Sequence, residues 1–289
     1  MLTVLHGSDV HFGRPHRPNV ATAFLEMART VAPDVIVLAG DFTQRAKVRE
    51  YEQARTFLRQ LHDVPVVVTP GNHDIPLYRV LERIFAPFRN YRAFISQELD
   101  TVTRVGGAVF VALSSAEAHR GLVNGRLEDH QLRFLARIFQ ETFDADVRIV
   151  VTHHALAPPP DGRSDATIPG NGALLDRFRE LGVDLVLSGH LHRGFVTRSS
   201  EVRPDHRHHG DIAIVHSGTA TSSRGRAAEK GENSVNVLRV GKEEIEVIPH
   251  WFEKDRSGFV AREPITIRRS ECPDFLSKKR REYAKRSLR

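Results

Sequence analysis

Short apolar runs and longer amphipathic stretches alternate along the first quarter of the chain. The runs at residues 2–9, 34–41 and 64–74 ("LTVLHGSD", "DVIVLAGD" and "VPVVVTPGNHD") predict buried strands. Residues 19–31 and 47–61 place apolar side chains three and four positions apart, which predicts helices. Strands separated by helices of this length predict crossover units with parallel strand pairing.

The alternation continues through the middle of the chain and then gives way to β-structure. A hairpin is predicted at residues 99–115. Helices and strands alternate over four further segments, at residues 127–143, 147–154, 172–183 and 184–192. After residue 193 the pattern is mostly that of strands, at residues 194–200, 211–218, 234–241 and 244–252. Together these elements predict an α/β fold with two sheets in one core, flanked by helices.

The formal net charge of +6 is concentrated at one end of the chain. Residues 268–289 hold nine Lys or Arg against three acids, so residues 1–267 sum to zero. We therefore expect one domain at residues 1–267 and a basic tail at 268–289. A neutral domain weakens the argument for nucleic-acid binding that the net charge alone would suggest. The tail is expected to be a solvated end, with an anionic lipid surface or a nucleic acid as alternative partners.

The single cysteine limits the disulfides and metal sites that the chain can form. Cys272 alone excludes an intramolecular disulfide and a metal site built from several thiolates. No charged n-region precedes the first apolar segment, and no apolar run approaches the roughly 18 residues of a membrane span. We expect a cytoplasmic protein, peripheral at the membrane if the basic tail binds lipid.

Five of the predicted strands end in Asp, Asn or His. These residues are Asp9 and His11, Asp41, Asn72, His73 and Asp74, His153 and His154, and His190 and His192. The carboxyl ends of parallel strands meet at one edge of a sheet, where sites usually form. A lone Asp often only caps a helix, and a lone buried His often makes one hydrogen bond. One shared site, however, explains all five strand ends better than five separate coincidences.

The donor types in this set favour a pair of metal ions. Carboxylate, imidazole and amide-oxygen donors without thiolate suit Mn²⁺, Fe²⁺ or Fe³⁺, Co²⁺ or Zn²⁺. Two cations about 3.5–4 Å apart need anionic charge between them. Asp41 stands alone at its strand end and is the candidate for the bridging carboxylate. The residues therefore predict a dinuclear metal centre whose metals the sequence leaves open.

In their order along the chain, these residues resemble the motif series of the calcineurin-like metallophosphoesterase superfamily. The blocks are Asp9-Val10-His11, Gly40-Asp41, Gly71-Asn72-His73-Asp74, His153 and Gly189-His190-Leu191-His192. The stretches "GRLEDHQLRFL", "GVDLVLSGHLH" and "SGTATSSRGRAAEKGENSVNVLRV" also resemble the bacterial class III cyclic nucleotide phosphodiesterase-like branch. The similarity extends to about residue 250.

The resemblance implies a four-layer α/β/β/α sandwich of two mixed sheets, the metallophosphoesterase fold. It implies that one metal ion is held by Asp9, His11, Asp41 and His192. The second would share Asp41 and be held also by Asn72, His153 and His190. His73 would stand beside the leaving group, with Asp74 as its orienting partner.

Two further histidines are candidates for substrate contact. The branch often continues its histidine as "HPP", whereas this chain reads "HHALAPPP". His153 is the expected ligand because it comes first after the strand. His154 is expected to face substrate or to support a ligand, and the exchanged assignment of the two is the alternative. His216 precedes the family's last site loop and is expected to contact substrate or, equally, to bond to backbone.

The resemblance implies an enzyme that hydrolyses a phosphodiester, either a cyclic nucleotide or another small diester. A metal-bridging hydroxide would attack phosphorus, and His73 would stabilise or protonate the leaving oxygen. A metal-dependent nuclease and a lipid-linked nucleotide-sugar pyrophosphate hydrolase are the alternative enzymes. A non-catalytic phosphate-binding scaffold is the contrasting class. It predicts the loss of a ligand or of His73, and the chain retains them all.

Overall fold

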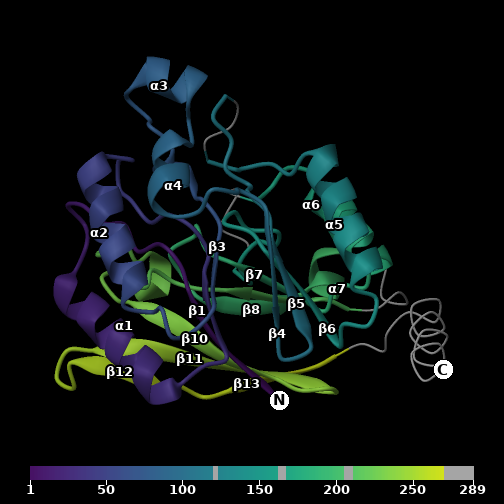
Figure 1. Ribbon diagram of the computed structural model, residues 1–289. Coiled ribbons are helices and arrows are strands. Elements are labelled where there is room, and N and C mark those ends of the chain that lie inside the picture. The colour runs from purple at the N-terminus through teal and green to yellow at the C-terminus, as the bar shows by residue number, and fades with distance from the viewer. Residues whose placement is uncertain (120–122, 162–166, 205–210, 270–289) are drawn as a thin grey trace.

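Two β-sheets face each other at the centre of the molecule, and helices cover their outer faces (Figure 1). The computed structural model describes residues 1–119, 123–161, 167–204 and 211–269. The first sheet has the order β12 (Gly258–Ala261), β11 (Glu244–Glu253), β10 (Ser234–Val240), β1 (Leu2–Gly7), β2 (Val35–Leu38), β3 (Val66–Val68), and β13 (Ile265–Arg268) also pairs with β11. The second has the order β4 (Thr101–Val105), β5 (Ala108–Ala112), β6 (Val147–Val151), β7 (Leu185–Ser188), β9 (Ala213–His216), β8 (Phe195–Arg198).

Both sheets are mixed, as the resemblance implied. Strands β1, β2 and β3 are parallel, and β10 joins β1 in antiparallel fashion. Strands β5, β6, β7 and β9 are parallel, whereas β4 and β8 pair antiparallel at the two edges. The hairpin predicted at residues 99–115 is the β4–β5 pair. The β-rich second half does not form a layer of its own, because its strands extend both sheets.

Helices flank the sheets in two groups. The chain forms α1 (Pro18–Val31), α2 (Val48–Arg59), α3 (Val80–Phe85), α4 (Arg89–Phe94), α5 (Asp129–Glu141), α6 (Asn171–Glu180) and α7 (Ser199–Val202), with short 3₁₀ turns at Asn72–Asp74 and Ala227–Glu229. Figure 1 shows α1 and α2 beside the first sheet and α5 and α6 beside the second. Within the described ranges, no helix is long and apolar enough to cross a membrane.

The alternation of side chains along the strands explains the layers. In β1, Val4 packs between the two sheets, while its neighbour Leu5 packs against the helix side. Leu5 shares a cluster with Phe24 of α1 and Phe57 of α2. On the far side, the second sheet packs against α5 and α6 in a separate cluster. Since successive strand residues point to opposite faces, each strand contributes to two apolar layers, and each fully buried aliphatic side chain contributes about 1.5–3 kcal/mol.

The parallel strands fix where the polar residues lie. The loop after β1 runs beside the loop after β2, because Asp9 donates its backbone N–H to Gly40 and His11 donates to Asp41, at 3.0 and 2.9 Å. The loop after β7 is likewise joined to the loop after β6, through the backbone N–H of Gly189 and the carbonyl of His153. Two sheets thus direct their carboxyl ends to one rim.

Candidate metal centre

Five of the seven predicted ligands have a left-handed backbone. The φ angles are 57° at Asp9, 50° at His11, 56° at Asp41, 72° at His190 and 55° at His192. Only nine non-glycine residues of the described part have positive φ, so the ligands supply more than half of them. Each such conformation costs of order 1–3 kcal/mol and persists where the surrounding structure holds it. The strain therefore concentrates at the rim that carries the predicted ligands.

A first donor cluster consists of Asp9, His11, Asp41 and His192. The Nε2 atom of His11 lies 3.4 Å from Asp9 Oδ1, 3.5 Å from Asp41 Oδ2 and 3.4 Å from the Nε2 atom of His192. Asp9 Oδ1 lies 3.2 Å from His192 Nε2. All four side chains are buried. Donor atoms bound about 2.1 Å from one ion stand about 3–3.4 Å apart, so this spacing is that of a coordination shell.

A second donor cluster consists of Asp41, Asn72, His153 and His190. The Nε2 atom of His153 lies 3.5 Å from Asp41 Oδ1, 3.2 Å from Asn72 Oδ1 and 3.3 Å from His190 Nδ1. His153 is fully buried, whereas Asn72 and His190 are partly exposed. The same atoms that the sequence predicted for a second ion therefore converge on one point.

Asp41 joins the two clusters, since its Oδ2 faces the first and its Oδ1 faces the second. Two buried carboxylate oxygens, Asp9 Oδ1 and Asp41 Oδ2, have no hydrogen-bond partner. A buried anionic oxygen without a donor is costly unless a cation is near it. The residues therefore fit a pair of metal ions bridged by Asp41.

Backbone carbonyls orient three of the four imidazoles. Because a carbonyl can only accept, the Nδ1–H of His11 donates to Thr43, that of His153 to Ala39 and that of His192 to Arg224, at 3.3, 2.7 and 3.1 Å. Each ring thereby leaves Nε2 as the nitrogen that faces its cluster. Such outer contacts fix the tautomer and raise the basicity of a metal ligand.

Two glycines are required by close packing at the rim. A Cβ atom on Gly71 would collide with the carboxylate of Asp41, and one on Gly189 would collide with the Ser8 side chain and crowd Asp9. The glycines of "GN" and "GH" therefore let the loops approach the two aspartates, and a side chain at either position would displace a ligand.

Burial and charge pull the pKa values of the ligands in different directions. Burial alone would raise the pKa of Asp9, but the charge of His192, whose Nε2 lies 3.2 Å from Asp9 Oδ1, holds it well below its usual range. Burial lowers the pKa of His11 to about 4 and that of His190 to about 3. Burial also acts to lower the pKa of His153, but the charge of Asp41 outweighs it and raises that pKa to about 9. Ionised carboxylates and neutral imidazoles are the forms that bind metals.

A model of the calcineurin-like phosphoesterase family matches residues 2–194. The chain belongs to this family. The matched region contains every ligand of both donor clusters, and the family and fold imply a dinuclear metal centre at this rim.

Relatives and solved structures agree with this assignment. A probable cyclic nucleotide phosphodiesterase of Synechococcus sp. is 28% identical over 186 residues, which cover 62% of this chain and 65% of the relative. A purple acid phosphatase from yellow lupin (Lupinus luteus) superposes with a TM-score of 0.64 at 14% identity, over 93% of this chain and 54% of the lupin chain. A dimetal phosphatase from Danio rerio gives a TM-score of 0.62 at 13% identity, over 93% and 99%. At these identities the structures show a shared fold.

His73 stands beside both clusters without belonging to either. Its ring centre lies 4.9 Å from that of His11, edge to face. Its backbone N–H donates to Asp41 Oδ1 at 2.8 Å, and its Nδ1–H donates to the Gln44 carbonyl at 3.0 Å. The side chain is partly exposed. The remaining ring nitrogen, Nε2, is thus available at the mouth of the site.

The carboxylate of Asp74 contacts other groups than the His73 ring that it was predicted to orient. Its carboxylate accepts hydrogen bonds from the backbone N–H groups of Phe42, Thr43 and Gly71 and from the Thr43 hydroxyl, at 2.9–3.2 Å. The contact that orients the His73 ring therefore comes from Gln44, because the carboxylate of Asp74 turns away to tie the loops after β2 and β3 together.

The two candidate substrate histidines are both fully buried. His154 accepts or donates a hydrogen bond with the Ser115 hydroxyl at 2.9 Å, and its ring centre lies 4.4 Å from that of His190. Its donor atom also lies within 4.8 Å of those of His153 and His190. The ring of His216 stacks on Phe195 at 4.1 Å. Because both rings are fully buried, the structure favours the alternatives given above, a support of the ligands for His154 and a bond within the protein for His216, and substrate contact by either stays a prediction.

Three residues near the site were missing from the sequence prediction. Ser8 donates its hydroxyl hydrogen to Asp9 Oδ2 at 2.7 Å. Gln44 accepts from His73 through its carbonyl, and its side-chain oxygen accepts from the Arg224 guanidinium at 2.9 Å. Burial lowers the pKa of Arg224, and the charges of Asp41 and Asp9 counteract this. Arg224 lies in the stretch "SGTATSSRGR", which carried the resemblance but no predicted role.

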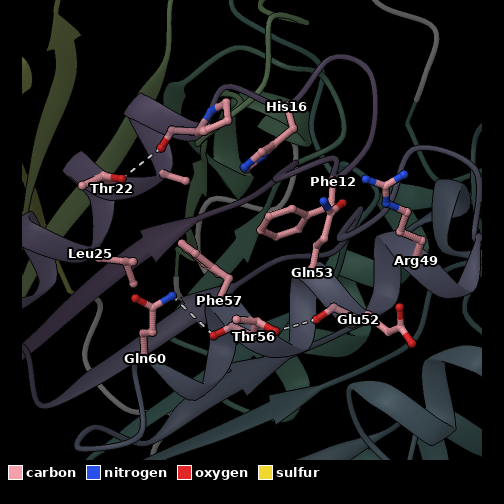
Figure 2. Close-up of a pocket in the computed structure, with 12 residues that line it drawn as sticks. Phe12, His16, Thr22, Leu25, Arg49, Glu52, Gln53, Thr56, Phe57 and Gln60 are labelled. Atoms are coloured by element: carbon pink, nitrogen blue, oxygen red, sulfur yellow. Dashed lines mark hydrogen bonds between the residues drawn. The ribbon is translucent and has the colours of Figure 1, made fainter.

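The groove between α1 and α2 is a separate feature. It encloses about 490 Å³ and is lined by Phe12, His16 and ten other residues of the two helices and the loop before α1. Figure 2 shows Phe12 and Phe57 among the lining side chains, together with Glu52 and Gln53 of α2. None of its lining residues is a predicted ligand. The donor clusters, and not this groove, therefore carry the chemistry.

Proposed function

We propose that the protein is a metal-dependent phosphodiesterase that acts on a cyclic nucleotide or another small phosphodiester. The observation that carries the proposal is the shared carboxylate of Asp41, which presents one oxygen to each donor cluster. The oxygen and nitrogen donors suit Mn, Fe, Zn or Co. A metal pair held there would activate water as a nucleophile and neutralise the phosphoryl oxygens.

The chain's own residues complete the site. Asp9, His11 and His192 would hold the first ion together with Asp41. Asn72, His153 and His190, again with Asp41, would hold the second. Their orientation is fixed in advance by the carbonyls of Thr43, Ala39 and Arg224, so little rearrangement is needed during the reaction.

His73 is assigned to the leaving group. Its Nδ1–H is committed to the Gln44 carbonyl, so Nε2 is the atom that stabilises or protonates the departing oxygen. Arg224 is assigned to a non-reacting phosphoryl oxygen, because it is a half-buried cation held near both aspartates by Gln44. The diester class is supported by the resemblance to the Synechococcus relative, a probable cyclic nucleotide phosphodiesterase, and the substrate itself is part of the proposal.

The test is hydrolysis of a substrate panel by metal-stripped protein resupplied with Mn²⁺. The panel holds bis-p-nitrophenyl phosphate, 2′,3′- and 3′,5′-cyclic AMP, single-stranded DNA and a nucleotide-sugar lipid pyrophosphate. The Asp41→Asn variant, purified in the same way, controls for a contaminating phosphatase.

We expect turnover of the chromogenic diester and of one cyclic nucleotide, and neither by Asp41→Asn. Preferred turnover of DNA or of the lipid pyrophosphate would replace the substrate class. The absence of turnover with Mn²⁺, Fe²⁺, Co²⁺ and Zn²⁺ would overturn the enzymatic proposal in favour of a phosphate-binding scaffold.

A further inference from the structure

Helix α3 and the loop before it turn their apolar side chains away from the protein. The α3 patch consists of Leu77, Tyr78, Val80, Leu81, Ile84 and Phe85. Tyr78 is 71% exposed, Leu81 73% and Phe85 80%. These nine consecutive positions hold six of the eleven exposed large apolar residues in the part of the chain that the structure describes. Single exposed apolar residues are ordinary, whereas a contiguous group marks an interaction site.

The polar side chains of the same segment point inward. Arg79 donates to the backbone carbonyls of Arg45 and Ala46 at 3.3 and 2.8 Å, and its Nε pairs with Glu82 at 2.5 Å. Arg83 donates to the Ala118 carbonyl at 2.5 Å. No residue of α3 is buried. The helix is therefore the reverse of an ordinary amphipathic surface helix, and specific hydrogen bonds hold it that way.

The patch is connected to the loop that holds His73. It begins four residues after His73, and Arg79 binds the same loop whose Gln44 carbonyl holds the His73 ring. Figure 1 shows α3 standing clear of both sheets, beyond α4. A surface that covered this patch would therefore contact a segment that is tied to the His73 loop.

The surroundings of the patch are strongly basic. Residues 45–50 and 77–92 contain seven Lys or Arg and two Glu, although residues 1–267 as a whole sum to zero. Lys47 and Arg49 are exposed at the start of α2, and the side chain of Arg89 is 67% exposed. The guanidinium of Arg45 lies 4.7 Å from the centre of the Tyr78 ring. The residues around the apolar patch thus carry a net positive charge, although the domain as a whole is neutral.

We propose that the α3 patch docks the protein on an anionic lipid surface. Exposed aliphatic and aromatic side chains enter the boundary between headgroups and acyl chains, and the surrounding cations meet anionic headgroups. A second copy of the chain fits less well, because a two-fold contact would set the cations of one patch against those of the other. A nucleic acid would pair with the cations but leave Leu81 and Phe85 in water.

This proposal is independent of the basic tail. Residues 270–289 lie outside the described part of the chain, and the tail was the only lipid-binding segment that the sequence suggested. The α3 patch instead lies within the folded domain. Its substitution should therefore abolish docking in the full chain with the tail still present.

The experiment is vesicle flotation of the full-length protein. Vesicles of phosphatidylcholine with phosphatidylglycerol are compared with vesicles of phosphatidylcholine alone, at low and high salt. The test variant is Leu81→Asp/Phe85→Asp. The matched control is Val102→Asp/Ile265→Asp, which changes two exposed apolar residues of β4 and β13 in the same way. Melting temperature and hydrolysis of bis-p-nitrophenyl phosphate establish that each variant is folded.

We expect the wild-type and control proteins to float with anionic vesicles and less so with neutral vesicles or at high salt. The test variant should lose about tenfold or more of its partition while hydrolysing the soluble diester at an unchanged rate. Equal flotation of wild type and test variant would overturn the proposal and assign lipid binding to the tail. The proposal would also be overturned if no protein floated with the vesicles and light scattering showed that the substitutions only dissociated a dimer.

Discussion

The two donor clusters share Asp41 but differ in how they are enclosed. In the first cluster all four side chains are buried, and both histidines are fixed through Nδ1 by backbone carbonyls. In the second, Asn72 and His190 are partly exposed, and His190 presents Nδ1 rather than Nε2. The first cluster is thus the more rigid, and the second is the one that solvent and substrate reach. The difference implies tight retention of one ion and easier exchange of the other.

Removing the shared carboxylate should have the largest effect. Asp41→Asn keeps the shape of the side chain but offers one oxygen and one amide nitrogen, so it cannot bridge two cations. We expect kcat/KM to fall about a thousandfold or more and both ions to be lost on dialysis. Metal content by mass spectrometry and diester hydrolysis measure the two effects. Asp63→Asn, at an exposed aspartate, is the matched control. Retention of one full metal equivalent would show that the clusters do not depend on a common ligand.

His73→Ala should separate chemistry from metal binding. Because the ring belongs to neither cluster, both ions should remain, while loss of the leaving-group contact slows turnover about a hundredfold for an alkyl diester. For bis-p-nitrophenyl phosphate the loss should be under about tenfold, because p-nitrophenolate departs without a proton. The rates on the two substrates are compared with those of His62→Ala, which changes an exposed histidine. An equal loss on both substrates would contradict the assigned role.

Parallel substitutions in the two clusters test the asymmetry directly. His11→Ala removes a donor that solvent cannot replace, because its surroundings are fully buried. His190→Ala removes a partly exposed donor whose place water can take. We expect Mn²⁺ affinity at the affected site to fall about a hundredfold for the first variant and about tenfold for the second. Calorimetric titration of metal-stripped protein measures both. Equal losses, or the reverse order, would remove the distinction between the clusters.

Much of the fold could be predicted from the sequence because the side chains of a strand point alternately to its two faces. Val4 and Leu5 pack on opposite faces of β1, and this pattern of apolar neighbours predicted strands buried on both sides. The sequence did not predict which of the late strands would join which sheet. Strand β10 pairs with β1 across more than 230 residues, and no local pattern distinguishes that partner from another strand. The predicted boundary at residue 267 remains untested, although β13 extends to Arg268.

The ligands could be predicted from the sequence because each follows the end of a strand, whereas the groups that orient them could not. The carbonyls of Thr43 and Ala39 orient His11 and His153 through backbone atoms that every residue possesses, so no residue type signals them. The resemblance implied that Asp74 orients His73, but the turn directs its carboxylate toward Phe42 and Thr43. The inward polar face of α3 likewise depends on carbonyls distant in sequence.

Ser8→Ala should have the smallest effect, and it concerns the first cluster alone. The Ser8 hydroxyl and the His190 backbone N–H both donate to Asp9 Oδ2, which leaves Oδ1 directed at the cluster. Without the hydroxyl, one hydrogen bond still holds the carboxylate, so we expect about a tenfold loss of affinity for the tightly held ion. The affinity at the second site should not change, and titration of Mn²⁺ into metal-stripped protein resolves the two. Ser96→Ala, which alters a hydroxyl that donates to Glu98, is the control. If the loss of affinity were confined to the weaker site, Ser8 would act through His190 on the second cluster. Tight retention of the ion in the first cluster would then not depend on Ser8.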